Sequence, residues 1–286
     1  EARVELSALL NVEQNTLHFG PSTSQNTYVL SHAFKGLNSK RKVIVVTNQD
    51  HEANSGAWRK LEKVGFCVRE WKVSTISGSL DINDLSKLLD DKVLLVAFPH
   101  CSNIVGEVNP VKKICKLIKS FGAYSCVDGV SYAPHGFSDI TDLGADIYLF
   151  STYKTYGTHL GIMYISDQLN KILESQGHYF NERLATKRFV PAGPDHAQIA
   201  SSVGIADYIK SVYKHHFQNS VDLKQMAKSV HEMQRSHEAK LLEPLLNYLK
   251  GRDDLRVLGS TSIKERVPTV AIDLKERGKQ LAVNLG

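Results

Sequence analysis

Lys154 stands in a short polar segment between two apolar runs. The segment Ser151–Gly157 reads STYKTYG, with IYLF shortly before it and IMYI shortly after it. A lysine held between buried strands loses its charge easily and becomes a nucleophile toward carbonyl groups. The alternative is a lysine on a hairpin that extends its ammonium group to solvent. Taken alone the segment favours this alternative, so the other polar segments decide the interpretation.

Asp128 follows the apolar run AYSCV directly and precedes Gly129. A carboxylate at the end of a buried strand must find a partner or change its pKa, and the alternative is an Asp-Gly turn or helix cap. The segment Gly20–Asn26 (GPSTSQN) offers hydroxyls and free amides before a predicted helix. Such a helix start binds phosphate well, and its alternative is a simple N-cap by Ser22 or Ser24.

Together these residues match the needs of pyridoxal 5'-phosphate. That cofactor takes a lysine for its aldehyde, a carboxylate for its ring nitrogen, hydroxyls for its phosphate and a flat group against its ring. The protonated ring then accepts electrons from the substrate Cα. Lys154, Asp128, Ser22 with Thr23, and His51 are the candidates for these roles, in the chain order that such enzymes use.

Other cofactor and metal motifs are absent from the sequence. There is no GxGxxG and no GxxxxGK[ST], so dinucleotide and P-loop sites have no support. Two segments begin like the zinc motif HExxH, but Ser55 and Arg235 stand where the second histidine is required. The four cysteines form no CxxC pair. We therefore expect no metal site and no disulfide framework, and a reducing compartment, the cytoplasm, fits best.

Composition excludes several classes of protein. The chain has 286 residues, of which 42% are hydrophobic and 23% charged, as in a soluble globular protein. Its 35 Lys and Arg residues are scattered and exceed the 30 Asp and Glu residues by only 5 charges, which gives no case for nucleic acid. No run of 18 apolar residues could span a membrane.

Strand and helix patterns alternate through the first two-thirds of the chain. This alternation predicts an α/β fold with a mostly parallel sheet, whose ligands bind at the carboxyl ends of the strands. The polar segments after the predicted strands are therefore expected to share one site. The predicted strands are Asn15–Gly20, Lys42–Thr47, Cys67–Val73, Val93–Phe98, Ala123–Val127, Ile147–Phe150 and Ile162–Ile165, and the helices are Ser24–Leu37, Ala53–Val64, Ile82–Leu89 and Val111–Ser120.

The last third has a different pattern. Helices are expected over Ile199–Tyr213 and Val221–Lys250, and strands over Leu255–Leu258 and Thr269–Leu274, before a final helical stretch. We predict a large domain over 1–218 and, over 219–286, a linker helix with a smaller α+β domain that is incomplete. The absence of an initial Met indicates part of a longer protein, so a lost targeting peptide would not be visible.

Three segments in order resemble the class V aminotransferase family of fold-type I pyridoxal-phosphate enzymes, especially its cysteine-desulfurase-like members. His100–Gly106 (HCSNIVG) followed by Asn109-Pro110 is similar to the family's H-x-S-N-x-x-G…N-P segment. Cys126–Gly129 is similar to its V-D-G/A element, and Ser151–Gly157 to its lysine segment S-x-H/Y-K-x-x-G. The resemblance implies the aspartate-aminotransferase-like fold and a homodimer.

The resemblance also implies roles for single residues. Lys154 forms the Schiff base, an aldimine, and moves the Cα proton, Asp128 pairs with the ring nitrogen, and His51 stacks on the ring. Asn103, with Ser131 nearest to a second family position, contacts the ring hydroxyl. Arg188–Ala197 is similar to the segment that reaches the partner subunit's phosphate. The phosphate in the chain's own site is assigned to Ser22, Thr23, Ser151 and Tyr153, where Tyr153 replaces the usual histidine.

The predicted function is a pyridoxal-phosphate enzyme acting on an amino acid, a transferase or lyase. Cysteine desulfurases need a mobile cysteine near the C-terminus, and no cysteine follows Cys126 in this chain. Transamination and C–S cleavage or β-elimination without a persulfide therefore stay open as alternatives. A non-catalytic binding relative is a remote one, because Lys154 and Asp128 are both present.

Overall fold

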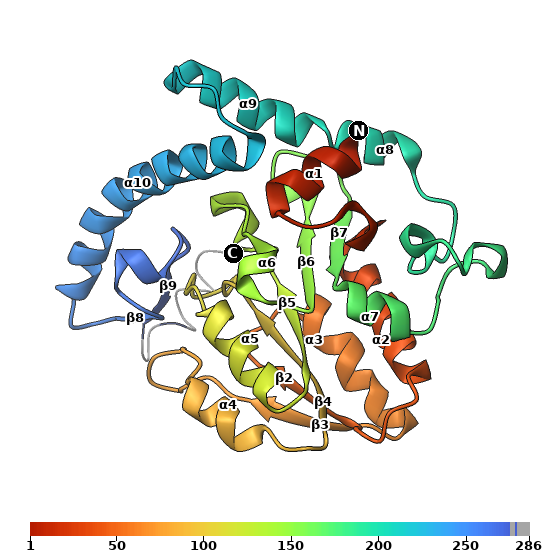
Figure 1. The fold of residues 1–286 in the computed structure, drawn as a ribbon. Helices are drawn as coiled ribbons and strands as arrows, with labels where there is room; N and C mark the ends of the chain where they lie inside the picture. The colour runs from red at the N-terminus through yellow and green to blue at the C-terminus, as the bar shows by residue number, and fades with distance from the viewer. Residues whose placement is uncertain (275–277, 279–286) are drawn as a thin grey trace.

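The computed structural model describes residues 1–274 and 278. Within them a central sheet has seven strands in the order β1-β7-β6-β5-β4-β2-β3 (Figure 1). Neighbouring strands from β6 to β3 run parallel, whereas β7 is antiparallel to both β6 and β1. The strands are β1 (Leu17–Gly20), β2 (Val43–Thr47), β3 (Cys67–Trp71), β4 (Val93–Pro99), β5 (Tyr124–Asp128), β6 (Ile147–Ser151) and β7 (Gly161–Ile165).

Helices cover both faces of this sheet, as the alternating sequence pattern predicts. The helices before the last third are α1 (Ala2–Leu10), α2 (Thr23–Gly36), α3 (Glu52–Arg59), α4 (Ile82–Leu88), α5 (Val111–Ser120), α6 (Ile140–Leu143) and α7 (Asp167–Ile172). They are followed by α8 (His196–Ser201), α9 (Gly204–His216) and α10 (Leu223–Lys250). The chain thus has the expected mostly parallel α/β architecture.

The core lies in two layers because side chains alternate along each strand. Val43 and Val45 of β2 pack into one layer with α1, α5 and α9, whereas Ile44 and Val46 pack into the other with α2 and α3. Every residue of β2 and β4 is buried. Burying each such aliphatic side chain contributes about 1.5–3 kcal/mol, so these runs fix the sheet.

The structure corrects some predicted helices in the main body. α1 forms before Asn15, where the sequence patterns above predict no element. The predicted helix over 53–64 is α3 plus a 3-10 turn over Lys60–Val64, which ends at Gly65 with φ 92°. The predicted helix over 199–213 is split into α8 and α9. α10 continues through Pro244, which reduces its backbone hydrogen bonding locally without ending it.

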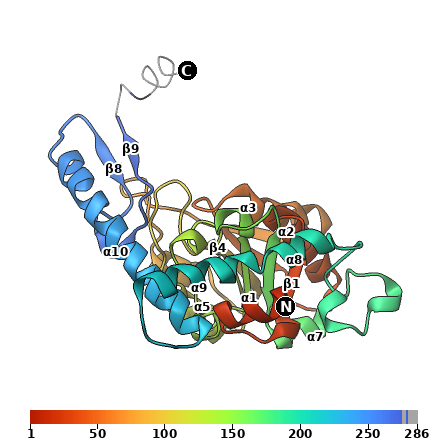
Figure 2. The same ribbon diagram turned by 90° about the horizontal axis from the view of Figure 1, so that it is seen from above.

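The end of α10 leads to a two-stranded antiparallel sheet of β8 (Arg256–Leu258) and β9 (Ala271–Asp273). Figure 2 shows these elements at one end of the molecule, beyond the central sheet. The first half of α10 packs on the main core through Ala227 and Val230. The proposed division at residue 218 stays a prediction, and the final predicted helix lies outside the described residues.

Candidate active site

A cavity of about 310 Å³ lies at the carboxyl ends of the strands. The segments that follow β1, β2, β4, β5 and β6 all contribute side chains to it, as parallel-sheet topology requires. Every residue predicted for the cofactor site borders it. The lining side chains among those predictions are Ser22, Thr23, His51, Asn103, Asp128, Ser131, Ser151, Tyr153 and Lys154.

The floor of the cavity carries two carboxyl groups, Asp128 and Asp50. Asp128 is 5% exposed and accepts a hydrogen bond of 2.8 Å from the Val130 amide. Burial raises its pKa, although that amide and the charges of His51 and Lys154 oppose the rise. Burial and the nearby charge of Asp128 raise the pKa of Asp50 further. Neither carboxyl group forms an ion pair within 4.0 Å among the described residues. The site therefore has uncompensated acidic groups that a cationic nitrogen would satisfy.

Lys154 lies at the rim of the same cavity, at the end of a 3-10 turn over Thr152–Lys154 in the β6–β7 hairpin. The expected burial of this lysine is wrong, since its side chain is exposed. The reason is topological, because the turn projects beyond the edge of the sheet. Its ammonium group forms no hydrogen bond or ion pair with other described residues, so it is available to a ligand.

The His51 side chain is held in place because it also caps a helix. Its Nδ1 accepts a hydrogen bond of 3.0 Å from the Ala53 amide and so caps α3. Because Nδ1 is the acceptor, the neutral ring carries its proton on Nε2. The cap holds one orientation of a ring that borders the cavity.

The turn before α2 forms a polar site, which we call the anion cradle. The hydroxyls of Thr23 and Ser151 lie 2.8 Å apart, and Ser22 caps α2 by accepting from the Gln25 amide. The amides of Thr23 and Ser24 donate to no other described residue, which leaves them free for an anion. A Cβ at Gly161 would lie 2.4 Å from the Ser22 carbonyl carbon, so β7 can approach this turn only with glycine there.

Some residues of the cavity were missed by the sequence predictions. Asp50 was overlooked although it directly precedes His51 in a segment that follows a buried strand. His159 stacks on Tyr153 with ring centroids 4.9 Å apart, and its Nδ1 lies 3.2 Å from the Pro21 carbonyl oxygen. No pattern in the sequence marks His159, because it comes from the far side of the hairpin.

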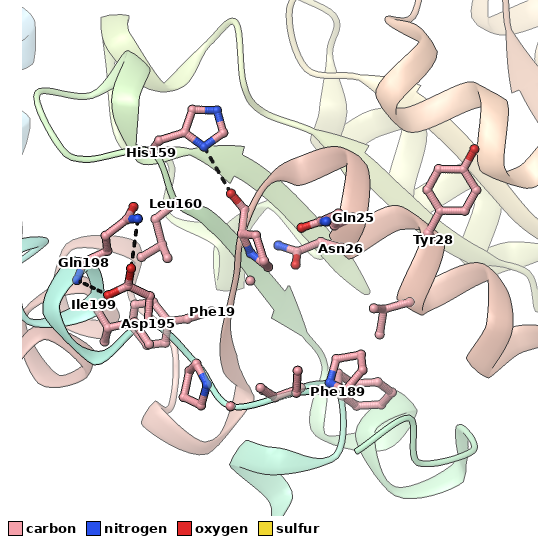
Figure 3. A pocket seen from close by; sticks show the side chains of 18 residues that line it. Phe19, Gln25, Asn26, Tyr28, His159, Leu160, Phe189, Asp195, Gln198 and Ile199 are labelled. Carbon is pink, nitrogen blue, oxygen red and sulfur yellow. Dashed lines mark hydrogen bonds between the residues drawn. The ribbon is translucent and has the colours of Figure 1, made fainter. Parts of the chain in front are cut away.

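A second, larger cavity of about 790 Å³ lies beside the first, and His159 lines both. Figure 3 shows its walls, with His159, Gln25 and Asn26 on one side and Phe189, Asp195 and Gln198 around the rest. Most of Arg188–Ala197, the segment predicted to reach a partner's phosphate, borders this cavity. Arg188 itself does not, since its guanidinium donates to carbonyls of Asn170, Leu173 and Glu182.

Comparison with known proteins decides the family. The family model for aminotransferase class-V matches residues 1–284. The chain belongs to the class-V aminotransferase family. An aminotransferase-like protein of Gibberella zeae is 33% identical over 96% of this chain and 66% of its own length. A cysteine desulfurase of Yersinia pseudotuberculosis is 39% identical over 42% of this chain and 30% of its own.

Solved structures show a fold shared with cysteine desulfurases. A crystal structure of a cysteine desulfurase from Escherichia coli superposes with a TM-score of 0.76, at 19% identity, over 96% of this chain and 67% of that one. The predicted fold class is thereby confirmed. The class-V chain described here spans just under two-thirds of the length of its aminotransferase-like relative. Among the described residues, no helix combines the length and apolar character needed to cross a membrane.

Proposed function

We propose that the protein is a pyridoxal-phosphate-dependent enzyme that acts on an amino acid and is cysteine-desulfurase-like. The observation that carries this proposal is the single cavity that joins the exposed amine of Lys154, the buried carboxyl of Asp128 and the free amides before α2. Membership of the class-V aminotransferase family supports it. The residues of the cavity fit the cofactor. Its buried carboxyl group suits the cationic ring nitrogen, and the free amides and hydroxyls before α2 suit the anionic phosphate.

Lys154 would hold the cofactor aldehyde through its amine and then move the proton of the substrate Cα. When bound, the cofactor supplies an electron sink for the carbanion left at that carbon. Asp128 would form a hydrogen bond with the ring nitrogen and share its proton. Because the carboxyl group is buried and has no basic partner, a protonated ring nitrogen would be a favourable partner for it. This geometry keeps the negative charge of Asp128 at the floor and the amine at the rim.

The other lining residues would orient the ring and the phosphate. His51 would cover one ring face, since its cap on α3 fixes the imidazole plane. Asn103, which is exposed, and Ser131 would contact the ring hydroxyl. The phosphate would take the helix-start amides and the hydroxyl groups of Ser22, Thr23, Ser151 and Tyr153.

The reaction after proton removal is proposed to be C–S cleavage, β-elimination or transamination without a persulfide on this chain. Cys101 borders the cavity but is 2% exposed, and burial raises its pKa to about 12. Burial raises the pKa of Cys115 to about 12 as well, and that of Cys126 well above its ordinary value. Thiols that stay protonated are poor nucleophiles, so none of these three suits sulfur transfer.

We propose a homodimer whose interface includes the larger cavity. Segment Arg188–Ala197 forms much of its wall, and Tyr179 and Phe180 nearby in sequence are 92% and 79% exposed. A cavity of about 790 Å³ with mostly apolar walls, and exposed aromatic side chains, are each typical of a surface covered by another chain. We further propose the cytoplasm as its location, since all four cysteines are free.

The test is a titration of the purified protein with pyridoxal 5'-phosphate, followed by cysteine or alanine. We expect a yellow protein whose absorption changes with an amino acid, and loss of the yellow band in Lys154→Ala but not in Lys171→Ala. A protein that stays colourless with added cofactor would contradict the proposal. With cysteine, β-elimination releases sulfide, ammonia and pyruvate, whereas C–S cleavage leaves alanine and releases sulfide only with an added thiol reductant. Transamination is separated by alanine, which then yields pyruvate without ammonia.

A further inference from the structure

One turn of α10 contacts two of the loops that carry residues of the cofactor cavity. Gln234 and Glu238 contact the loops that follow Lys154 and Asp128, and Arg235 contacts the Arg266 backbone, which pairs with the end of the Asn103 loop. We call these three residues the α10 contact turn. None of them lines the cavity, so the proposed cofactor chemistry assigns them no task.

The first contact is to the Lys154 loop through Tyr156. Tyr156 is one of two non-glycine residues in the described chain with positive φ, at 67°. Such a backbone is strained for a residue other than glycine and persists only where surrounding contacts enforce it. The Tyr156 ring packs on Tyr208 of α9 with centroids 4.3 Å apart. Burial raises the pKa of Tyr156, while a hydrogen bond with Gln234 opposes the rise.

The second contact is to the loop that follows Asp128. His135, which ends the 3-10 turn after Ser131, has its Nδ1 2.7 Å from Glu238 Oε1. Both side chains are largely shielded, at 19% and 24% exposure. Arg235 lies 3.3 Å from the other carboxylate oxygen and holds Glu238 in place. The pKa of Glu238 is lowered by His135 and Arg235 despite its burial, so the carboxylate is charged.

The third contact reaches the Asn103 loop indirectly. Arg235 donates a hydrogen bond of 2.8 Å to the Arg266 carbonyl oxygen. The backbone on either side of Arg266 pairs with residues 106–108, through bonds of 2.8 Å from Val108 to Glu265 and from Val267 to Gly106. The loop with Asn103 therefore rests on the same turn of α10 as the other two.

We infer that the α10 contact turn is a positioning element that holds the Lys154, Asp128 and Asn103 loops in one fixed arrangement. Its residues act through Tyr156, His135 and the Arg266 backbone, and not by contact with ligand. The inference deepens the proposed function and rests on it for the identity of the ligand. The arrangement of the Lys154 amine relative to the Asp128 carboxyl group does not depend on a ligand, so it can be tested in cofactor-free protein.

The test uses Glu238→Gln and Tyr156→Phe, which keep the shape of each side chain. Glu243→Gln and Tyr248→Phe, both on the same helix, are matched controls at exposed positions. The first readout is labelling of Lys154 by trinitrobenzenesulfonate in cofactor-free protein across a pH series, quantified at the peptide level. The second is the dissociation constant of pyridoxal 5'-phosphate, with thermal melting measured alongside.

We expect both test variants to label Lys154 about threefold faster near neutral pH, because the loop that carries its amine is no longer held in one arrangement. Cofactor affinity should fall about three- to tenfold, and the controls should match the wild type. Wild-type labelling profiles in both test variants, or equal changes in all four proteins, would overturn the inference. Should Glu238→Gln not fold, Tyr156→Phe decides alone.

The outcomes also separate this inference from the proposed function. Altered Lys154 labelling in a protein that never binds the cofactor would leave the positioning role standing and remove the function. Normal cofactor binding with unaltered labelling in both test variants would remove the positioning role and leave the proposed function standing.

Discussion

The two cavities on either side of the α2 N-terminus differ in what their walls carry. The larger, of about 790 Å³, has apolar walls and the amide side chains of Asn26 and Gln198, of which Asn26 Nδ2 and Gln198 Oε1 are buried without a partner among the described residues. The smaller, of about 310 Å³, holds the buried carboxyl groups, the free lysine and the anion cradle. We therefore propose that the unpaired carboxyl groups and the lysine at the strand ends, and not cavity volume, locate the chemistry.

The comparison is tested most strongly by exchanging one carboxyl group in each cavity. Asp128→Asn should lower turnover of an amino acid by about 10²-fold or more, since an amide cannot keep the ring nitrogen protonated. Asp195→Asn should change turnover by less than about twofold, because asparagine caps α8 as well as aspartate does. Steady-state rates with saturating cofactor measure both. Equal losses in the two variants would contradict the distinction.

A matched pair of glycines tests the anion cradle. A Cβ at Gly161 would lie 2.4 Å from Ser22 and 2.7 Å from the Thr23 amide nitrogen, whereas at Gly193 in the larger cavity nothing lies within 4 Å. Gly161→Ala should therefore shift the α2 start and weaken cofactor binding by about tenfold or more, as overpacking commonly costs about 1–3 kcal/mol. Gly193→Ala should bind cofactor like the wild type. Fluorescence titration of cofactor into each protein gives the answer.

Two buried histidines, one near each cavity, should respond oppositely to substitution. His100 has its Nδ1 2.9 Å from the Tyr148 hydroxyl, whereas both ring nitrogens of His18 lack a partner among the described residues. His100→Phe should cost about 1–3 kcal/mol, because the Tyr148 hydroxyl is left without that partner. His18→Phe should leave stability unchanged or raise it. Urea unfolding at neutral pH measures both changes.

Because of the same two histidines, we expect the protein to lose stability in acid. Burial lowers the pKa of each to about 3, below the value near 6.5 of an unfolded chain. The unfolded state thus takes up protons first as the pH falls. Stability should be full above about pH 6.5 and decline toward pH 3, by up to about 1.4 kcal/mol per pH unit for each histidine. In His18→Phe the decline should be shallower, and an unchanged slope would refute the assignment.

The smallest effect is expected for Cys101→Ser. Its Sγ donates to the Ser102 carbonyl oxygen at 3.6 Å, which a hydroxyl can also do, and the buried thiol does not ionise readily. Sulfide release from cysteine should change by less than about twofold. Complete loss of sulfide release would restore Cys101 as the nucleophile.

The sequence was sufficient for the sheet and for the segments that form the small cavity. Buried strands such as β2 and β4 are continuous apolar runs, and parallel topology then sends Asp128, His51 and Ser22 to one edge. The class-V resemblance assigned the residues at this edge. The roles themselves stay predictions, although the side chains that carry them do meet.

Other features depend on tertiary contacts that no local pattern contains. The exposure of Lys154 depends on how far its turn projects beyond the sheet, and the larger cavity depends on where the segment after α7 folds back. Asp50 and Asp128 border one cavity because β2 and β5 lie on either side of β4. The contacts of the α10 contact turn join residues between 31 and 103 positions apart, so spacing along the chain could not reveal it.

The central claim is that Lys154 carries the cofactor. Its most direct test is borohydride reduction of the protein saturated with pyridoxal 5'-phosphate, followed by peptide mapping of the trapped group. We predict one modified peptide, with the pyridoxyl group on Lys154 and the yellow colour lost. A reduced protein in which Lys154 is unmodified, or in which surface lysines such as Lys171 are modified equally, would contradict the account.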